Sequence, residues 1–322
     1  MLKYKLSRKI LGALVLAIVV FISFNYLYPK SSSSDFAVSA QNNITGYISK
    51  NSNPSAPLQS KIKQNVSQKI TLPILMYHHI NTVESLPKDD KTGINLRVSP
   101  EIFEKQLQFL QKNKFNTINS FQLQDYLNGG FDLPDNPIML TFDDGFTDSY
   151  TNAFPVLKKY NMSGDFGIVT SMVGQSDHMS WDNLNEMKNA GMSFASHTDN
   201  HCTTAIKDKN GEFEDSPISN IEKPCSSFAI QEKLSSGQIK YEFEKSKNKL
   251  EKNLNIKISH LIYPFGFYNK QAQEIAKNLG YSFATTVKPQ KNNIVDFTNP
   301  FEVGRFRVQG QQVGDLKGFF VN

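Results

Sequence analysis

The chain has 322 residues, of which 39% are hydrophobic, so it can hold one domain of about 250 residues with a substantial core. Its formal charge is +5, but the basic residues before position 31 supply all of that charge, and the remainder of the chain is neutral on balance. This balance removes the electrostatic basis for nucleic-acid binding, and no nucleic-acid partner is expected.

Residues 1–30 have the features of a membrane segment. A basic cluster precedes an uncharged apolar run, Ile10 to Pro29, which is long enough to cross a bilayer once as a helix and leaves the rest of the chain outside the cytoplasm. This run is longer than the core of an ordinary signal peptide, and the small residues at 38–40 lie well beyond it. We therefore favour an uncleaved anchor, with a cleaved signal and a secreted protein as the alternative. Residues 31–70, rich in Ser, Asn and Gln, are predicted to be a flexible linker.

Apolar runs and segments of helical period alternate through residues 71–322, which we predict to be one domain. The expected strands are 73–77, 115–118, 137–142, 164–170, 192–196, 259–263, 281–287 and 302–308. The expected helices are 100–110, 153–160, 180–190, 239–250 and 270–279. This alternation predicts a parallel α/β sheet with helices outside, and the number of units favours a barrel over an open sheet. Residues 202–237 lack the pattern and are expected to form a surface insertion.

Two adjacent carboxylates, Asp143 and Asp144, follow directly after the strand predicted at 137–142. A buried strand ends where solvent or substrate begins, so we expect both side chains on a loop at the mouth of the sheet. Side chains alternate along an extended chain, which favours different tasks for the two carboxylates, one as a metal ligand and one as a base. Asp-Asp-Gly is also ordinary turn chemistry, and a purely structural turn is the alternative.

Histidines follow two other predicted strands. His78 ends the first strand, and His197 and His201 follow the strand at 192–196. Four residues apart, His197 and His201 come together if the segment makes one helical turn. Two imidazoles and one carboxylate form an open site for a divalent metal, with zinc as the first expectation and other first-row metals as alternatives. The alternative is that one of the two histidines only caps or packs. Structural or surface roles are expected for His79, His178 and His260.

Four motifs occur in a fixed order along the chain. They are Leu75-Met76-Tyr77-His78, Thr141-Phe142-Asp143-Asp144-Gly145, Ser196-His197-Thr198-Asp199-Asn200-His201 and Tyr263-Pro264-Phe265-Gly266. Together they resemble the polysaccharide deacetylase family with its nodulation-type homology domain, and the joint pattern is more specific than any one motif. The first and last motifs are similar to the exopolysaccharide branch, the poly-β-1,6-N-acetylglucosamine N-deacetylases (intercellular adhesin deacetylases). The resemblance implies a distorted (β/α) barrel over roughly the residues 70–310.

The resemblance implies a metal-dependent hydrolase of N-acetyl groups. Asp144, His197 and His201 would hold the metal, and Asp143 would be the base that takes a proton from water. His78 is the candidate acid for the leaving amine, because a histidine beside a metal site can titrate near the working pH.

Further roles follow from the same resemblance. The backbone N–H of Phe265 would contact the substrate oxyanion, Tyr263 would line the sugar groove, and Pro264 of the same turn would be a further substrate contact. Thr198 would orient the loop between the two histidines through a side-chain hydrogen bond.

The chain also departs from other branches of the family. Chitooligosaccharide and peptidoglycan deacetylases usually carry an arginine where this chain has Ile262, and their Leu-x-His motif is not found after Val287. Either Arg305 or Arg307 is a candidate to orient Asp143 instead. An ion pair with any surface acid would explain these arginines equally well.

Cys202 and Cys225 are the only cysteines, and both lie in the predicted insertion. Because disulfides persist outside the cytoplasm, we favour a bridge between them. It would close a loop of about 23 residues and stabilise the fold by about 3 kcal/mol on the chain-entropy account. Cys202 adjoins His201, so an additional metal ligand is the alternative.

The leading hypothesis is a membrane-anchored extracellular enzyme that removes N-acetyl groups from poly-β-1,6-N-acetylglucosamine. It would release acetate and leave free amines on a biofilm matrix or cell surface. The first alternative changes the substrate to peptidoglycan or a chitooligosaccharide. A second alternative is a catalytically silent glycan-binding wall module, because a fold alone does not establish a function. No sequence feature indicates an oligomeric state.

Overall fold

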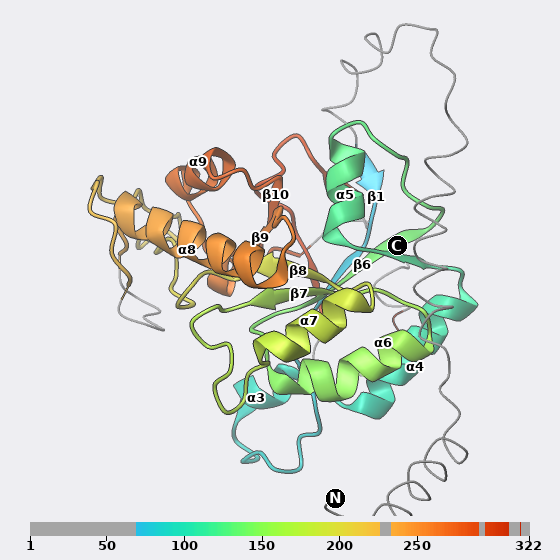
Figure 1. Ribbon diagram of the computed structural model, residues 1–322. Coiled ribbons are helices and arrows are strands. Elements are labelled where there is room, and N and C mark those ends of the chain that lie inside the picture. Colours follow the sequence, from blue (N-terminus) through green and yellow to red (C-terminus); the bar gives the residue numbers. More distant parts are fainter. Residues whose placement is uncertain (1–68, 226–232, 290–293, 309–315, 317–322) are drawn as a thin grey trace, which may run out of the picture. The chain divides into compact units, whose positions relative to one another are not determined.

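The central sheet of the computed structural model consists of parallel strands in the order β10-β9-β8-β7-β6-β2-β12, with β5 paired to the start of β6 (Figure 1). In that order the strands are Phe283–Thr285, His260–Ile262, Ser193–Ser196, Asp165–Ile168, Pro137–Phe142, Ile74–Tyr77 and Phe306–Arg307, and β5 is Asn116–Ile118. The structure describes residues 69–225, 233–289, 294–308 and 316. Within these residues the predicted parallel α/β arrangement is confirmed.

A segment near the end of the described chain, which includes the outer strand β12, bonds to β2 and also to β10 at the opposite edge of the sheet. Val303 N–H donates to Ala284 O in β10 (3.0 Å), and Val308 N–H donates to Met76 O in β2 (3.0 Å). The sheet is therefore curled, with this segment bonded to both of its edges. Of the strand expected at 302–308, only the two residues of β12 have strand geometry.

Helices lie outside the sheet. Their bounds are α3 Lys91–Asn95, α4 Pro100–Lys112, α5 Ser120–Leu127, α6 Phe154–Lys159, α7 Trp181–Asn189, α8 Ser236–Leu254 and α9 Lys270–Asn278, and a π-helical turn, Ser149–Ala153, leads into α6. Figure 1 shows α4, α6 and α7 grouped on one side of the strands, and α8 and α9 beside β8, β9 and β10. The predicted helices are confirmed, whereas α3 and α5 were not expected.

Helix α4 shows how local signals and burial act together. The hydroxyl of Ser99 accepts a hydrogen bond from Ile102 N–H (3.3 Å), and Pro100 occupies the first turn. Its buried face packs Phe103 edge-on against Tyr77 of β2, with ring centroids 5.3 Å apart. Packing of this apolar face is what retains the helix against the sheet.

Two short strand pairs lie outside the central sheet. Strands β1 (Lys69–Thr71) and β11 (Ile294–Asp296) pair antiparallel, and strands β3 (His79–Ile80) and β4 (Arg97–Val98) pair in parallel. Sequence analysis predicted none of these strands. Each has two or three residues, which is too short for a periodic pattern.

All described residues belong to one structural unit, Ser60–Asn322. Within them, no helix has both the length and the apolar character needed to cross a membrane. The anchor predicted at residues 1–30 lies outside the described residues, and so does the predicted linker except for its last two positions.

The predicted insertion is tied to the rest of the fold by a disulfide. Cys202 and Cys225 are bridged, with Cα atoms 6.5 Å apart, and both side chains are buried. The predicted pairing is therefore confirmed, and Cys202 is not available as a metal ligand. Helix α8 begins at Ser236, so the last two residues of the predicted insertion belong to that helix.

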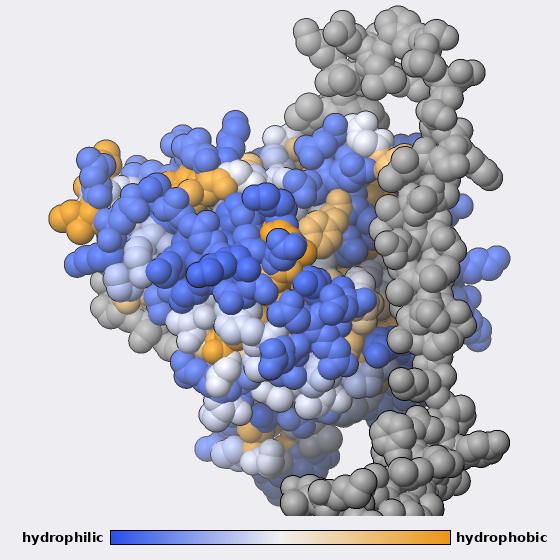
Figure 2. Space-filling model, in the orientation of Figure 1, coloured by the Kyte–Doolittle hydropathy of each residue, from blue (hydrophilic) through white to orange (hydrophobic). Residues whose placement is uncertain are grey.

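The molecular surface is mostly hydrophilic on the face shown in Figure 2. The large hydrophobic side chains exposed among the described residues are Phe131 (59%), Ile218 (87%) and Ile221 (68%). Two of these three lie in the insertion, which fits its prediction as a surface segment.

A fully buried hydrogen bond between a histidine and an aspartate connects strands β7 and β9. His260 Nδ1 lies 2.5 Å from Asp165 Oδ2, and His260 Nε2 lies 2.9 Å from the hydroxyl of Thr285 in β10. Ser120 and Ser193 donate hydrogen bonds to the other carboxylate oxygen of Asp165. The structural role expected for His260 is supported, and its partners bind β7, β8, β9, β10 and α5 together.

Burial lowers the pKa of His260, and the hydrogen bond and charge of Asp165 only partly oppose this effect. The imidazole is therefore more basic in the unfolded chain than in the fold. Its contribution to stability is complete above the unfolded pKa of about 6.5 and is lost as pH falls below that value.

We expect His260→Gln to lower the free energy of unfolding at pH 7.5 by about 1–3 kcal/mol, because it leaves Asp165 and Thr285 without their partner. It should also reduce the loss of stability between pH 7 and pH 5 relative to the parent. Urea unfolding at several pH values measures both effects, with His178→Gln as the control. Parallel pH curves for parent and variant would contradict the prediction.

Candidate metal centre and active site

Three predicted metal ligands converge at the carboxyl ends of β6 and β8. Asp144 Oδ1 lies 3.3 Å from His197 Nε2 and 3.3 Å from His201 Nε2, and the two Nε2 atoms are 3.2 Å apart. A tetrahedral ion with bonds of about 2.0 Å requires ligand atoms about 3.3 Å apart. The triangle therefore fits one face of a tetrahedral divalent-metal site. The side chains of Asp144 (17% exposed) and His201 (12%) leave this face accessible to solvent.

The loop that carries the second histidine does not make the helical turn that we expected. Thr198 (φ 66°) and His201 (φ 57°) both adopt left-handed backbone conformations, which are uncommon for residues other than glycine. The hydroxyl of Thr198 accepts a hydrogen bond from His201 N–H (3.0 Å), which is the kind of side-chain contact that its predicted orienting role requires. A left-handed turn, not a helical one, brings the two imidazoles together.

A backbone oxygen fixes the ring of His197. The Nδ1 atom of this buried histidine donates to Ile262 O (2.9 Å), so Nε2 faces the metal centre as an acceptor. Burial alone would lower the pKa of His197, but the hydrogen bond with Asp144 and the charges of Asp143 and Asp144 hold this pKa above its ordinary value.

The other carboxylate of the pair faces an arginine. Arg305 Nη1 and Nη2 donate to Asp143 Oδ1 and Oδ2 at 2.7 and 2.8 Å, and both side chains are buried. Burial favours a higher pKa for Asp143, but the charge and hydrogen bonds of Arg305 outweigh burial and lower this pKa. Of the two candidate arginines, Arg305 orients Asp143, whereas Arg307 is exposed.

Arg305 is also held in place by the fold. Its Nε donates to Thr286 O (3.0 Å), and Nη1 donates to the hydroxyl of Thr141 (2.9 Å). The guanidinium therefore bonds to Thr141 on β6 and to Thr286, the residue after β10. These contacts hold Asp143 in one orientation beside Asp144.

The predicted acid lies within electrostatic reach of both carboxylates. Burial lowers the pKa of His78, while the charges of Asp144 and Asp143 raise it and those of Arg305 and Arg307 lower it; the net direction is downward. His78 ends β2, which pairs with β6 through Tyr77 and Phe142, so the structure brings it to the same end of the sheet as Asp143.

The turn at 263–266 follows β9 and borders the metal ligands. Phe265 adopts a left-handed conformation (φ 56°), and its ring centroid lies 4.8 Å from that of His201. A Cβ atom on Gly266 (φ 72°) would lie 2.5 Å from Val287 N, so this position requires glycine.

Two expectations for this turn are wrong. Tyr263 is fully buried and stacks on Tyr268 with ring centroids 5.1 Å apart, so it does not line a sugar groove. Pro264 is also buried and shapes the turn from within. Phe265 is the residue of the turn that is partly exposed beside the metal centre.

A second aromatic group lies next to the two carboxylates. His79 stacks on Phe146 at a centroid distance of 3.8 Å, and its Nδ1 lies 2.7 Å from Asp148 Oδ2. His178 packs on Phe146 as well, with centroids 5.0 Å apart. These contacts fit the structural roles expected for His79 and His178, although sequence analysis did not identify Asp148 as the partner.

Comparisons with known proteins agree with this arrangement. Residues 131–284 match the profile of the family described as polysaccharide deacetylase. The chain is 28% identical over 218 residues to YxkH of Bacillus subtilis (strain 168), whose name assigns it to the polysaccharide deacetylases. This match covers 68% of the present chain but less than two thirds (65%) of YxkH.

Two further similarities cover a larger share of both proteins than the match to YxkH does. The chain is 26% identical over 273 residues to a poly-β-1,6-N-acetyl-D-glucosamine N-deacetylase of Staphylococcus aureus (strain MSSA476), covering 80% of this chain and 85% of that protein. The solved Streptococcus pyogenes deacetylase PplD, in complex with acetate, superposes with a TM-score of 0.63 at 25% identity. That superposition covers 79% of this chain and all of PplD.

A curled parallel α/β sheet that carries an Asp-His-His ligand set beside an arginine-bound carboxylate defines a candidate metallohydrolase. The family profile and the named relatives indicate which class of metallohydrolase the chain resembles. Residues 131–284 match the polysaccharide deacetylase family, and the chain is similar over a longer span to proteins named for that activity.

Proposed function

We propose that the protein is a metal-dependent polysaccharide N-deacetylase that acts on poly-β-1,6-N-acetylglucosamine. The observation that carries this proposal is the ligand triangle of Asp144, His197 and His201 directly beside the carboxylate of Asp143. The similarity to S. aureus proteins named for this activity supports the choice of polymer.

Zinc is the proposed metal. Two imidazole nitrogens and one carboxylate oxygen suit a borderline divalent ion, and their mutual distances fit tetrahedral coordination. Such an ion, when bound, lowers the pKa of water and polarises a carbonyl oxygen.

Asp143 is the proposed base. Because its pKa is lowered, its carboxylate is ionised throughout the neutral range and can accept a proton from the attacking water. A carboxylate with a low pKa is a weak base. Asp143 can therefore act only where the pKa of that water is lowered as well, which explains its place beside the ligand triangle.

The remaining groups act on the substrate amide. As water adds to the acetamide carbonyl, the backbone N–H of Phe265 would stabilise the charge that develops on the carbonyl oxygen. His78 would protonate the nitrogen as the C–N bond breaks. One water is consumed, and the products are acetate and a free amine on the sugar.

The proposed location follows from the N-terminal segment. An anchor at residues 1–30 would hold the catalytic domain outside the cytoplasm, where an exopolysaccharide is accessible. Deacetylation would make a neutral polymer partly cationic, so that it adheres to anionic cell surfaces.

The direct test is amine release from poly-β-1,6-N-acetylglucosamine by the full chain loaded with zinc. Peptidoglycan and chitin oligomers are assayed in parallel, and Asp143→Asn serves as the inactive control. We expect amine release from the β-1,6-linked polymer, and its loss in the control.

The other outcomes identify the alternatives. Activity on peptidoglycan or chitin oligomers alone would keep the chemistry and change the substrate. Glycan binding without amine release from any polymer would contradict an enzyme and favour a glycan-binding wall module.

A further inference from the structure

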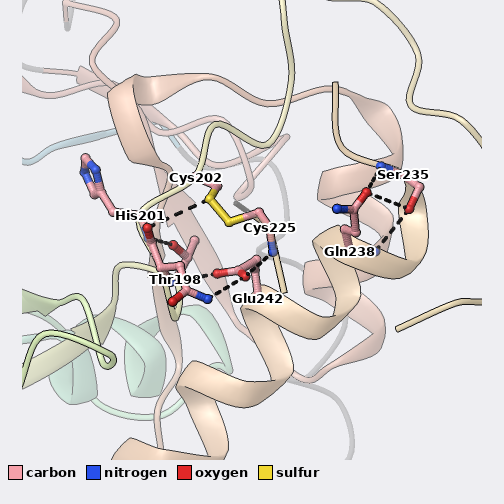
Figure 3. Close-up of a disulfide and its surroundings, with 8 residues drawn as sticks. Thr198, His201, Cys202, Cys225, Ser235, Gln238 and Glu242 are labelled. Atoms are coloured by element: carbon pink, nitrogen blue, oxygen red, sulfur yellow. Dashed lines mark hydrogen bonds between the residues drawn. A yellow bond between two sulfur atoms is a disulfide. The ribbon is translucent and has the colours of Figure 1, made fainter. Parts of the chain in front are cut away.

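A buried glutamate on α8 binds the loop that carries the metal ligand His201. Glu242 Oε2 accepts a hydrogen bond from Asn200 N–H (2.8 Å), and Oε1 accepts one from the side-chain amide of the same residue (2.9 Å). Oε1 also accepts from Cys225 N–H (3.2 Å). Glu242 thus contacts both the residue before His201 and one end of the disulfide (Figure 3).

The segment around His201 is held on both sides. On the N-terminal side, Asp199 accepts hydrogen bonds from the hydroxyl of Thr170 (2.6 Å) and from Lys249 Nζ of α8 (2.5 Å). On the C-terminal side, Cys202 is bonded to Cys225, which Glu242 contacts in turn. Figure 3 shows the His201 ring pointing away from this disulfide.

His201 needs such external support more than the other two ligands do. Asp144 follows directly from the six-residue strand β6, and a hydrogen bond to Ile262 O orients the ring of His197. Asp144 (φ 76°) and His201 (φ 57°) both have left-handed backbones, which persist only where surrounding contacts determine them. Asp144 lies two residues after a strand of the central sheet, whereas His201 lies on an irregular loop that no strand supports. The contacts that determine the loop of His201 come largely from α8 and the disulfide.

Full burial of a glutamate side chain is costly unless hydrogen bonds satisfy it. Glu242 is fully buried and receives its three donors from Asn200 and Cys225. Its main interactions are therefore with the chain on either side of His201.

We propose that Glu242 is a positioning residue for the metal centre, which acts with the Cys202–Cys225 disulfide to hold Asn200 and thereby aim His201 at the metal. This role rests on the proposed metal site and not on the identity of the polymer. Groups that orient metal ligands from outside typically contribute 10- to 100-fold to affinity or activity.

The test is the zinc affinity of Glu242→Gln, measured by competition with a chelating dye. Glutamine has the same shape, but its NH2 group cannot accept a hydrogen bond. At least one N–H that now bonds to a carboxylate oxygen of Glu242 would therefore face a second donor. We expect zinc to bind about 10- to 100-fold more weakly. The same substitution at Glu244, two positions along α8 and 40% exposed, should leave zinc affinity unchanged.

A stability control separates positioning from general loosening of α8. Ser235 caps this helix through Gln238 N–H, away from the metal ligands (Figure 3). We expect Ser235→Ala to lower the melting temperature without weakening zinc binding. An equal loss of affinity in this variant would show that any destabilisation of α8 has the same effect, and would overturn the proposal.

Two further variants cover the case in which Glu242→Gln does not fold. Asn200→Ala removes one of the three hydrogen bonds to Glu242, and Cys202→Ala with Cys225→Ala removes the bridge without leaving a free thiol. Both should weaken zinc binding. Unchanged affinity in these variants, or in a folded Glu242→Gln, would overturn the positioning role.

The readout is independent of the polymer. Zinc binding by the parent without amine release from any glycan would contradict the proposed function and leave the positioning role intact. A parent that binds no zinc would overturn both.

Discussion

Replacing Asp143 with Asn is expected to lower kcat/KM by about 10²–10⁴. The amide has the size of the carboxylate but cannot accept the proton of the attacking water. Zinc content should stay the same, because the ligand triangle consists of Asp144, His197 and His201. Amine release and zinc content, measured on the same preparation, test both parts.

Asp144→Asn is the matched control, since it makes the same change one residue along the chain. There we expect loss of zinc together with loss of activity, because a charged ligand is replaced by a neutral one. If Asp143→Asn kept more than about a tenth of the parent activity, Asp143 would not be the base.

Replacing Arg305 with Met should produce the largest loss of stability of the variants considered. Both partners of the Arg305–Asp143 pair are buried, and removing one partner of such a pair typically costs about 3–5 kcal/mol because a charge remains without compensation. Urea unfolding at neutral pH measures this loss. Arg307→Met, an exposed arginine two residues further on, should change stability by less than about 0.5 kcal/mol.

The same variant should change the dependence of activity on pH. Without Arg305, only the weaker influence of His197 and His78 opposes the effect of burial on the pKa of Asp143, so this pKa rises. The base must be ionised, and the acid limb of the kcat/KM profile therefore moves to higher pH. A folded Arg305→Met variant with an unchanged acid limb would contradict either the role of Asp143 or its control by Arg305.

Local signals were sufficient for much of the fold. The strand predicted at 137–142 coincides with β6, because an apolar run is bounded by an Asp-Asp-Gly turn. The helix predicted at 180–190 corresponds to α7, which has its N-terminal cap at Ser180. Helix α5 was missed although Asn119 and Gln122 form a capping box, because only two of its eight residues are buried and its apolar periodicity is weak.

The candidate site was predictable where its residues are neighbours in sequence. His197 and His201 lie four positions apart and Asp144 ends a strand, so chain order alone placed them at one end of the sheet. The choice between Arg305 and Arg307 depended on which side chain is buried, and no local pattern distinguishes them. The predicted position of Tyr263 in a sugar groove was wrong for the same reason, because its side chain is buried.

Glu242 illustrates what sequence patterns could not reveal. It lies 42 positions after Asn200, on a helix whose other charged residues are all at least partly exposed. Its side chain faces inward only because the loop before the insertion approaches α8. Such a contact depends on how distant segments pack, which periodicity does not describe.

The distance along the chain between Asp143 and Arg305 has a consequence for biosynthesis. These partners are 162 positions apart, whereas all three metal ligands are made before residue 202. During translation, the ligands are available well before the guanidinium that orients the base. A nascent chain that stops short of Arg305 would contain the three ligands, and also Glu242 and Ile262 that support them, but not the guanidinium that orients the base. The group that controls Asp143 is therefore the last part of the site to be synthesised.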